Sequence, residues 1–175
     1  TFDYHSKSHA LRFGTFFILF LVVSFTSIRF WHSSSFLFFL VLVILLLFVK
    51  FYGIQSQGSR RWVNLYVINL QPSELMKIGI ILFLSNYYHK ISEGDVNKIK
   101  YLLFPLIAIL APFILVLSQP DLGTAILILM SGMVVTWLAG VRWKIFAYLS
   151  ILSIVVAPIA ISFLKPYQKS RILTF

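Results

Sequence analysis

The segment Leu70–Leu84, LQPSELMKIGIILFL, is apolar from Ile78 onward but carries an acid, Glu74, and a base, Lys77, just inside its start. A continuous apolar run of this kind predicts a membrane-spanning helix. Placing one charged side chain at mid-membrane costs about 2.5–3.5 kcal/mol on insertion scales. Two such residues so close to a span therefore require a structural or a functional reason.

The amino-acid composition indicates whether this chain is soluble or lies in a membrane. Hydrophobic residues make up 59% of the 175 residues and charged residues only 11%, far below the roughly one quarter that is typical of soluble domains. We therefore expect an integral membrane protein. The absence of cysteine excludes disulfides and thiol chemistry. The chain begins with Thr1 and stops within an apolar segment, and we expect it to be a piece of a larger protein.

Six apolar runs predict an all-α, polytopic membrane helix bundle that forms one transmembrane domain over residues 1–175. The predicted spans cover about residues 11–30, 36–52, 72–88, 101–117, 122–138 and 145–164. An even number of spans places both termini, the loop 53–71 and the turn 118–121 on one side, which we call the first side. Gly132, Thr136 and Gly140 recur every four residues, a stripe of small residues that is typical of close helix packing.

The positive charge is spread over both sides of the predicted bundle. Net charge is +10, which favours anionic lipid or a phosphate-bearing substrate as a partner. Nucleic acid is not expected, because the basic residues lie in short loops between spans. Eight basic residues fall on the first side and six on the second, so the positive-inside rule does not decide the orientation.

Glu74 and Lys77 are spaced i,i+3, which places them on one face of a helix and within reach of each other. One interpretation is a structural ion pair that fastens helices together. The other is a charged wall of a water-filled cavity that opens on the first side, because charged residues inside a membrane commonly mark functional sites. The sequence leaves both interpretations open.

Three further segments carry polar groups on the first side. In QGSRRWVN, Gln57 to Asn64, the residues Arg60, Arg61 and Trp62 fit either an interfacial anchor or a pyrophosphate site built from guanidinium groups. In SQPDLGTA, Ser118 to Ala125, Asp121 either caps a helix or lines the same cavity.

The third segment is KPYQKSRIL, Lys165 to Leu173. Lys169 and Arg171 either flank the last span at the lipid headgroups or make further phosphate contacts. No metal site, glycine-rich nucleotide loop or nucleophile motif is present in the sequence, and no nucleotide cofactor is expected; a divalent cation is left open. The segments LQPSE and SQPDL also repeat a local pattern of Gln, Pro and an early acid at the start of a span.

Taken in order, these segments resemble the SEDS family of bacterial membrane proteins, the group of RodA and FtsW. The match rests on GSRRWVNL followed by LQPSELMK, on QPDLGTA and on YQKSRILTF, and the last two are more similar to the RodA side of the family. The resemblance implies a fold of about ten spanning helices, of which this chain holds about six. It further implies a multi-pass protein of the bacterial cytoplasmic membrane whose first side faces the periplasm.

The resemblance also implies a function, which is that of a peptidoglycan glycosyltransferase. Such an enzyme polymerises lipid II, an undecaprenyl pyrophosphate-linked precursor, and works with a class B penicillin-binding protein that crosslinks the strands. The implied substrate-binding residues are Arg60, Arg61, Trp62, Glu74, Lys77, Asp121, Lys169 and Arg171. The family's essential Asp is expected beyond residue 175, so this chain alone is expected to be inactive.

Two other functions fit the same sequence. A lipid II flippase would also need a polar cavity and basic residues on both sides. A scaffold that only docks the crosslinking partner would need neither. Formation of glycan polymer from lipid II separates the enzyme from both alternatives.

Overall fold

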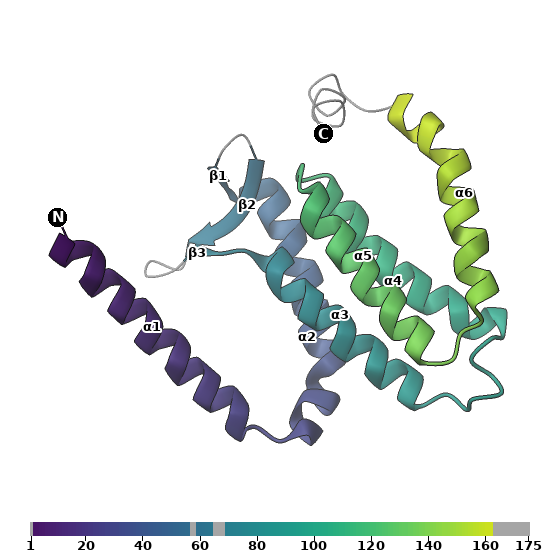
Figure 1. The fold of residues 1–175 in the computed structure, drawn as a ribbon, viewed down its shortest axis with the longest axis horizontal. Helices are drawn as coiled ribbons and strands as arrows, with labels where there is room; N and C mark the ends of the chain where they lie inside the picture. Colours follow the sequence, from purple (N-terminus) through teal and green to yellow (C-terminus); the bar gives the residue numbers. More distant parts are fainter. Residues whose placement is uncertain (1, 57–58, 65–68, 163–175) are drawn as a thin grey trace. The chain divides into compact units, whose positions relative to one another are not determined.

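The structure is a computed structural model and describes residues 2–56, 59–64 and 69–162 (Figure 1). Six helices dominate the described residues, as the sequence predicts. They are α1 (Phe2–Phe25), α2 (Ile28–Tyr52), α3 (Pro72–His89), α4 (Ile99–Leu117), α5 (Leu122–Leu138) and α6 (Trp143–Ser162). Three short strands, β1 (Ile54–Ser56), β2 (Ser59–Asn64) and β3 (Asn69–Leu70), lie between α2 and α3, where the sequence analysis expected only a loop.

Two of the described helices, α2 and α4, are long and apolar enough to cross a membrane by length and composition. Phe13–Phe25 and α5 are apolar but shorter. The helices agree with a polytopic helical fold, whereas the limits of each span in a bilayer stay a prediction.

The chain divides into two compact units, Thr1–Ser34 and Ser35–Phe175. In the first unit, α1 ends at a turn around Thr26 and Ser27, and α2 begins directly after it. The backbone N–H of Phe30 donates to both the carbonyl and the hydroxyl of Ser27, so Ser27 acts as an N-cap. Residues 31–35, which lie between the predicted spans 11–30 and 36–52, are therefore helical, because the cap at Ser27 starts α2 before them.

The second unit holds the helical core. Helix α5 packs against both α3 and α4. One buried cluster lies where α3 and α5 begin and includes Leu46, Met76 and Ile128. Another lies toward the end of α3 and includes Leu84 and Ile109. Because α3 and α5 start at the same end of this unit and α4 leads the chain back to that end, the loops after α2 and α4 meet there (Figure 1).

The small-residue stripe predicted along α5 is partly confirmed. Gly132 and Thr136 are buried, and a Cβ added to Gly132 would lie 2.6 Å from Cγ1 of Ile109 on α4. Gly140 has a different reason to be glycine. It follows the end of α5 with φ +93°, a left-handed conformation that favours glycine, and no atom lies within 4 Å of the Cβ position.

Replacing Gly132 by alanine is expected to lower the thermal stability of the protein in detergent. The added methyl group must displace Ile109, and overpacking of this kind costs about 1–3 kcal/mol, more than the roughly 1 kcal/mol that alanine gains in helix propensity. Gly123→Ala on the same helix is the matched control, because nothing lies within 4 Å of its Cβ position. Equal melting temperatures for the two variants would show that α4 and α5 do not approach closely at Gly132.

Candidate functional site

The segment between α2 and α3 forms a three-stranded antiparallel sheet in the order β1-β2-β3. Backbone pairing places Ile54 opposite Trp62 and Val63 opposite Leu70. Val, Ile and Trp are favoured on strands, which explains why this short segment pairs rather than staying a loop. The sheet carries Arg60, Arg61 and Trp62 on its middle strand and leads directly into the start of α3.

Arg61 connects this sheet to the turn between α4 and α5. Its Nε donates to the carbonyl of Gln119 at 3.2 Å, and its Nη2 donates to the carbonyl of Pro120. Its Nη1 lies 3.5 Å from Oδ2 of Asp121. The side chains of Arg61 and Asp121 are only 24% and 12% exposed. One guanidinium group therefore binds three consecutive residues of the turn, a geometry that arginine's planar fork permits and lysine's single ammonium does not.

Asp121 also joins the starts of α3 and α5. Its Oδ1 accepts from the backbone N–H of Thr124 at 3.3 Å and so caps α5. Its Oδ2 accepts from Nε2 of Gln71, the residue before α3, at 3.1 Å, and the same Nε2 lies 3.1 Å from the hydroxyl of Ser73. The carboxylate thereby ties together one strand and two helix starts.

Gln119 completes this network from the other side of the turn. It is buried, and its Nε2 donates to the carbonyl of Leu46 on α2 at 3.0 Å. Because buried amides are costly when left without a partner, this bond fixes the turn against α2. Sequence reasoning did not propose Gln71 or Gln119 as site residues. The repeated Gln-Pro pattern at the two helix starts was the available signal.

Glu74 and Lys77 form the second charged group at this end. Nζ of Lys77 lies 2.8 Å from Oε2 of Glu74, as the i,i+3 spacing predicts. The pair is open to the outside: 52% of the Glu74 side chain and 26% of the Lys77 side chain are exposed. An exposed pair of this type stabilises a helix by only about 0.3–0.5 kcal/mol. A contribution to stability therefore does not explain why this ion pair is present.

The structure thus brings four of the predicted site residues, Arg61, Asp121, Glu74 and Lys77, to one end of the helical unit. We call this the motif end, and it includes Gln71. Trp62 lies half-buried on β2, and the backbone of Arg60 lies beside it on the same strand. Lys169 and Arg171 lie outside the described residues. Among the described residues, no group of three or more His, Cys, Asp or Glu could hold a metal ion.

Comparison with known proteins identifies the family of this chain. The model of one family, described as cell cycle protein and covering FtsW, RodA and SpoVE, matches residues 4–175. The chain belongs to the FtsW/RodA/SpoVE family. This membership confirms the resemblance inferred from the four motifs. All segments of the motif end lie within the matched residues 4–175.

Several named relatives support the assignment. The chain is 38% identical over 174 residues to "Peptidoglycan glycosyltransferase MrdB" of Helicobacter pylori, covering 97% of this chain and 45% of the relative. It is 33% identical over 172 residues to "Probable peptidoglycan glycosyltransferase FtsW" of Buchnera aphidicola, covering 98% of this chain and 45% of the relative. The chain therefore spans about half the length of the FtsW/RodA/SpoVE relatives it matches.

Solved structures confirm the fold. The crystal structure of Thermus thermophilus rod shape determining protein RodA matches with a TM-score of 0.72 and 26% identity, over 85% of this chain and 49% of that chain. A chain from a structure titled as coordinating polymerization and crosslinking by a peptidoglycan synthase complex matches with a TM-score of 0.78 and 27% identity, over 95% of this chain and 49% of that chain. The prediction of a polytopic membrane helix bundle for this FtsW/RodA/SpoVE chain is confirmed.

Proposed function

We propose that the intact protein is a peptidoglycan glycosyltransferase that polymerises lipid II into glycan strands for cell-wall elongation. The observation that carries the proposal is the gathering of charged residues from three family motifs at one end of the helical unit. The names of the relatives, which are peptidoglycan glycosyltransferases, support the same reaction class.

The chemistry of this reaction needs cationic groups. The bond between the anomeric carbon of the donor sugar and its pyrophosphate breaks, and the bonding electron pair leaves with the pyrophosphate. A hydroxyl of the acceptor sugar forms the new bond and gives up its proton to a general base. Cationic donors placed where the negative charge develops lower the barrier. We assign the base to the family Asp that is expected beyond residue 175.

Lys77 is the strongest candidate for a phosphate contact among the described residues. Its ammonium group is partly open to the outside, and Glu74 holds it in place at 2.8 Å. Arg61 has a different proposed role. Because its guanidinium already binds Gln119, Pro120 and Asp121, it positions β2, and with it Arg60 and Trp62, against the helix starts. Lys169 and Arg171 remain proposed phosphate contacts.

The proposal includes a location and a partner. We place the intact protein in the bacterial cytoplasmic membrane with the motif end toward the periplasm, where peptidoglycan is assembled. A class B penicillin-binding protein is the proposed partner, because a structural relative belongs to a complex that coordinates polymerization with crosslinking. No divalent cation is assigned to the motif end.

The test is a reconstitution of the intact protein, with its transpeptidase partner, in the presence of labelled lipid II. Long glycan strands that grow with time are expected. Movement of lipid II across vesicle membranes without polymer formation would show that the protein is a flippase and not a polymerase. Full polymer formation after loss of both Glu74 and Lys77 would also overturn the site, because the charges would then serve no step of the reaction.

A further inference from the structure

The end of the helical unit opposite the motif end is built around Asn97. Its Nδ2 donates to the carbonyl of Gly140 at 3.3 Å, and its Oδ1 accepts from the backbone N–H of Arg142 at 2.8 Å. Beside these bonds, Val96 and Val141 are both buried. The Asn97 side chain therefore holds the loop between α3 and α4 against the turn between α5 and α6, and it fixes the backbone of Arg142, the residue before α6.

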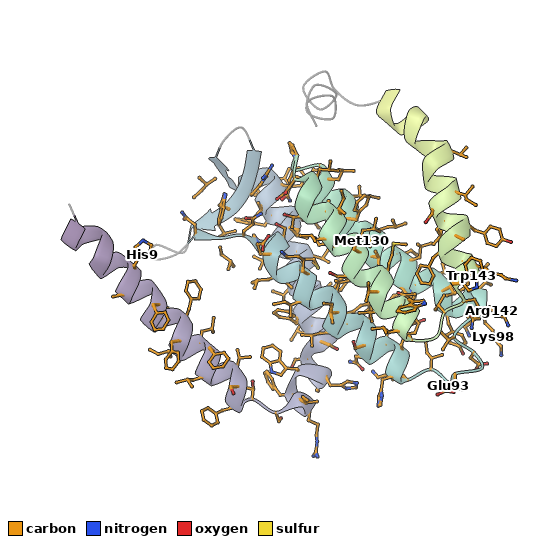
Figure 2. The ribbon with its side chains drawn as sticks, in the orientation of Figure 1. His9, Glu93, Lys98, Met130, Arg142 and Trp143 are labelled. Carbon is orange, nitrogen blue, oxygen red and sulfur yellow. The ribbon has the colours of Figure 1, made fainter. Side chains whose placement is uncertain are left out.

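This clip presents a group of cationic side chains. Lys100, Arg142 and Lys144 are all exposed, and Trp143 between the last two is 67% exposed. Figure 2 shows Arg142 and Trp143 together at the start of α6. We call Lys100, Arg142, Trp143 and Lys144 the basic corner.

The loop between α3 and α4 carries two acids, Asp95 and Glu93, against the three cations of the basic corner. Asp95 is occupied by Lys98, whose Nζ lies 2.6 Å from its Oδ1, and this bond raises the pKa of Lys98. Lys98 is therefore not counted in the basic corner. Glu93 is the other acid of the loop between α3 and α4. The Nζ of Lys100 additionally lies over the ring of Tyr101, 5.8 Å from the ring centre.

An apolar stripe continues from the basic corner along α6. Tyr148, Ile151 and Val155 follow Lys144 at helical spacings of four, three and four residues, so the four side chains share one face. All three are strongly exposed, between 59% and 70%. From Lys144 to Val155 the helix rises by roughly 16 Å at 1.5 Å per residue. This is close to half of the roughly 30 Å hydrocarbon core, which is the thickness of one leaflet.

We propose that the basic corner and this stripe bind an anionic phospholipid of the leaflet that lies at this end. Arg142 and Lys144 contact the phosphate, Trp143 lies at the level of the headgroups, and one acyl chain follows Tyr148, Ile151 and Val155. Both the charge and the length of this surface match such a lipid. Cations lie at one end, and the apolar face that follows them is about as long as one leaflet is thick. Anionic lipids are concentrated in the cytoplasmic leaflet, so the site also predicts that this end is cytoplasmic.

The experiment measures lipid retention by the intact protein. Native mass spectrometry of the purified protein, titrated with phosphatidylglycerol or phosphatidylcholine, gives the affinity for each lipid. Phosphatidylglycerol is expected to bind more tightly, and Arg142→Gln and Lys144→Gln are each expected to weaken it about fivefold, from roughly 1 kcal/mol per basic residue. The double variant is expected to lose about 25-fold. Lys50→Gln is the matched control, because it removes an exposed charge in the last turn of α2, outside the basic corner. It should leave the affinity for phosphatidylglycerol unchanged.

Two further arms test the geometry. Asn97→Ala removes no charge but releases the turn, so it is expected to weaken phosphatidylglycerol binding while phosphatidylcholine binding is unchanged. Glycerol phosphate, which has the phosphate without acyl chains, is expected not to compete. Equal binding of both lipids, native-like binding by the double variant, or competition by glycerol phosphate would each overturn the proposal. Because the readout is lipid retention, its failure is distinct from failure of the polymerisation assay.

Discussion

Replacing Lys77 by alanine in the intact protein is expected to lower the rate of glycan polymerisation by about 100-fold or more. Removal of one preorganised donor from a site of developing negative charge typically costs this much. The protein should still insert and keep its melting temperature, because the Lys77–Glu74 pair is exposed and stabilises α3 by only a few tenths of a kcal/mol. Single-turnover rates with labelled lipid II, measured beside a thermal melt, check both parts.

The chain offers a closely matched control for this experiment. Lys98 and Asp95 form the same i,i+3 lysine–acid pair, with 2.6 Å between Nζ and Oδ1, at the opposite end of the unit. Lys98→Ala should leave polymerisation unchanged. Lys77→Arg, which keeps the charge, should retain part of the activity. If Lys77→Ala and Lys98→Ala polymerise equally well, the Glu74–Lys77 pair is an ordinary surface ion pair and the proposed phosphate contact is wrong.

Arg61→Ala is expected to destabilise the protein by about 3 kcal/mol and to abolish most activity. Removing one partner of a largely desolvated pair leaves Asp121 with an uncompensated charge, and two carbonyls of the turn lose their donor at the same time. Arg61→Lys should recover only part of the stability, because an ammonium group cannot reach all three acceptors in the same geometry. Chemical or thermal unfolding in detergent measures the loss.

A double-mutant cycle decides whether Arg61 positions the sheet or touches phosphate. If Arg61 acts through Asp121, then Asp121→Asn and Arg61→Ala should each lower stability, and the double variant should be hardly worse than either single one. The coupling energy should then be about 1–3 kcal/mol. Additive effects on stability, together with a raised KM for lipid II in Arg61→Ala alone, would instead make Arg61 a substrate contact.

The sequence predicted the parts of this protein that depend on neighbouring residues. The length of each apolar run predicts a helix because the bilayer or the core must be spanned by a hydrogen-bonded backbone. The Glu74–Lys77 pair follows from a spacing of three residues within one helix, and it is present at 2.8 Å. The ordered motifs were sufficient to recognise the FtsW/RodA/SpoVE family, which the comparisons confirm.

The positions of turns and strands were harder to predict. Residues 31–35 lay between two predicted spans, but Ser27 caps a helix that runs through them. The sheet between α2 and α3 was not expected, because a strand of two to six residues carries too little periodic signal to be distinguished from a loop. Gly140 looked like part of a packing stripe, whereas its φ of +93° places it in the turn after α5.

The membrane-helical class, the family and the Glu74–Lys77 pairing can all be predicted from residues that lie close together along the chain. The folded structure is needed to see that Arg61 binds Asp121, sixty positions away, and that Asn97 holds the turn at Arg142. The physical reason is that a contact between distant segments depends on how α3, α4 and α5 pack. That packing brings together helix ends whose partners no spacing along the chain could reveal.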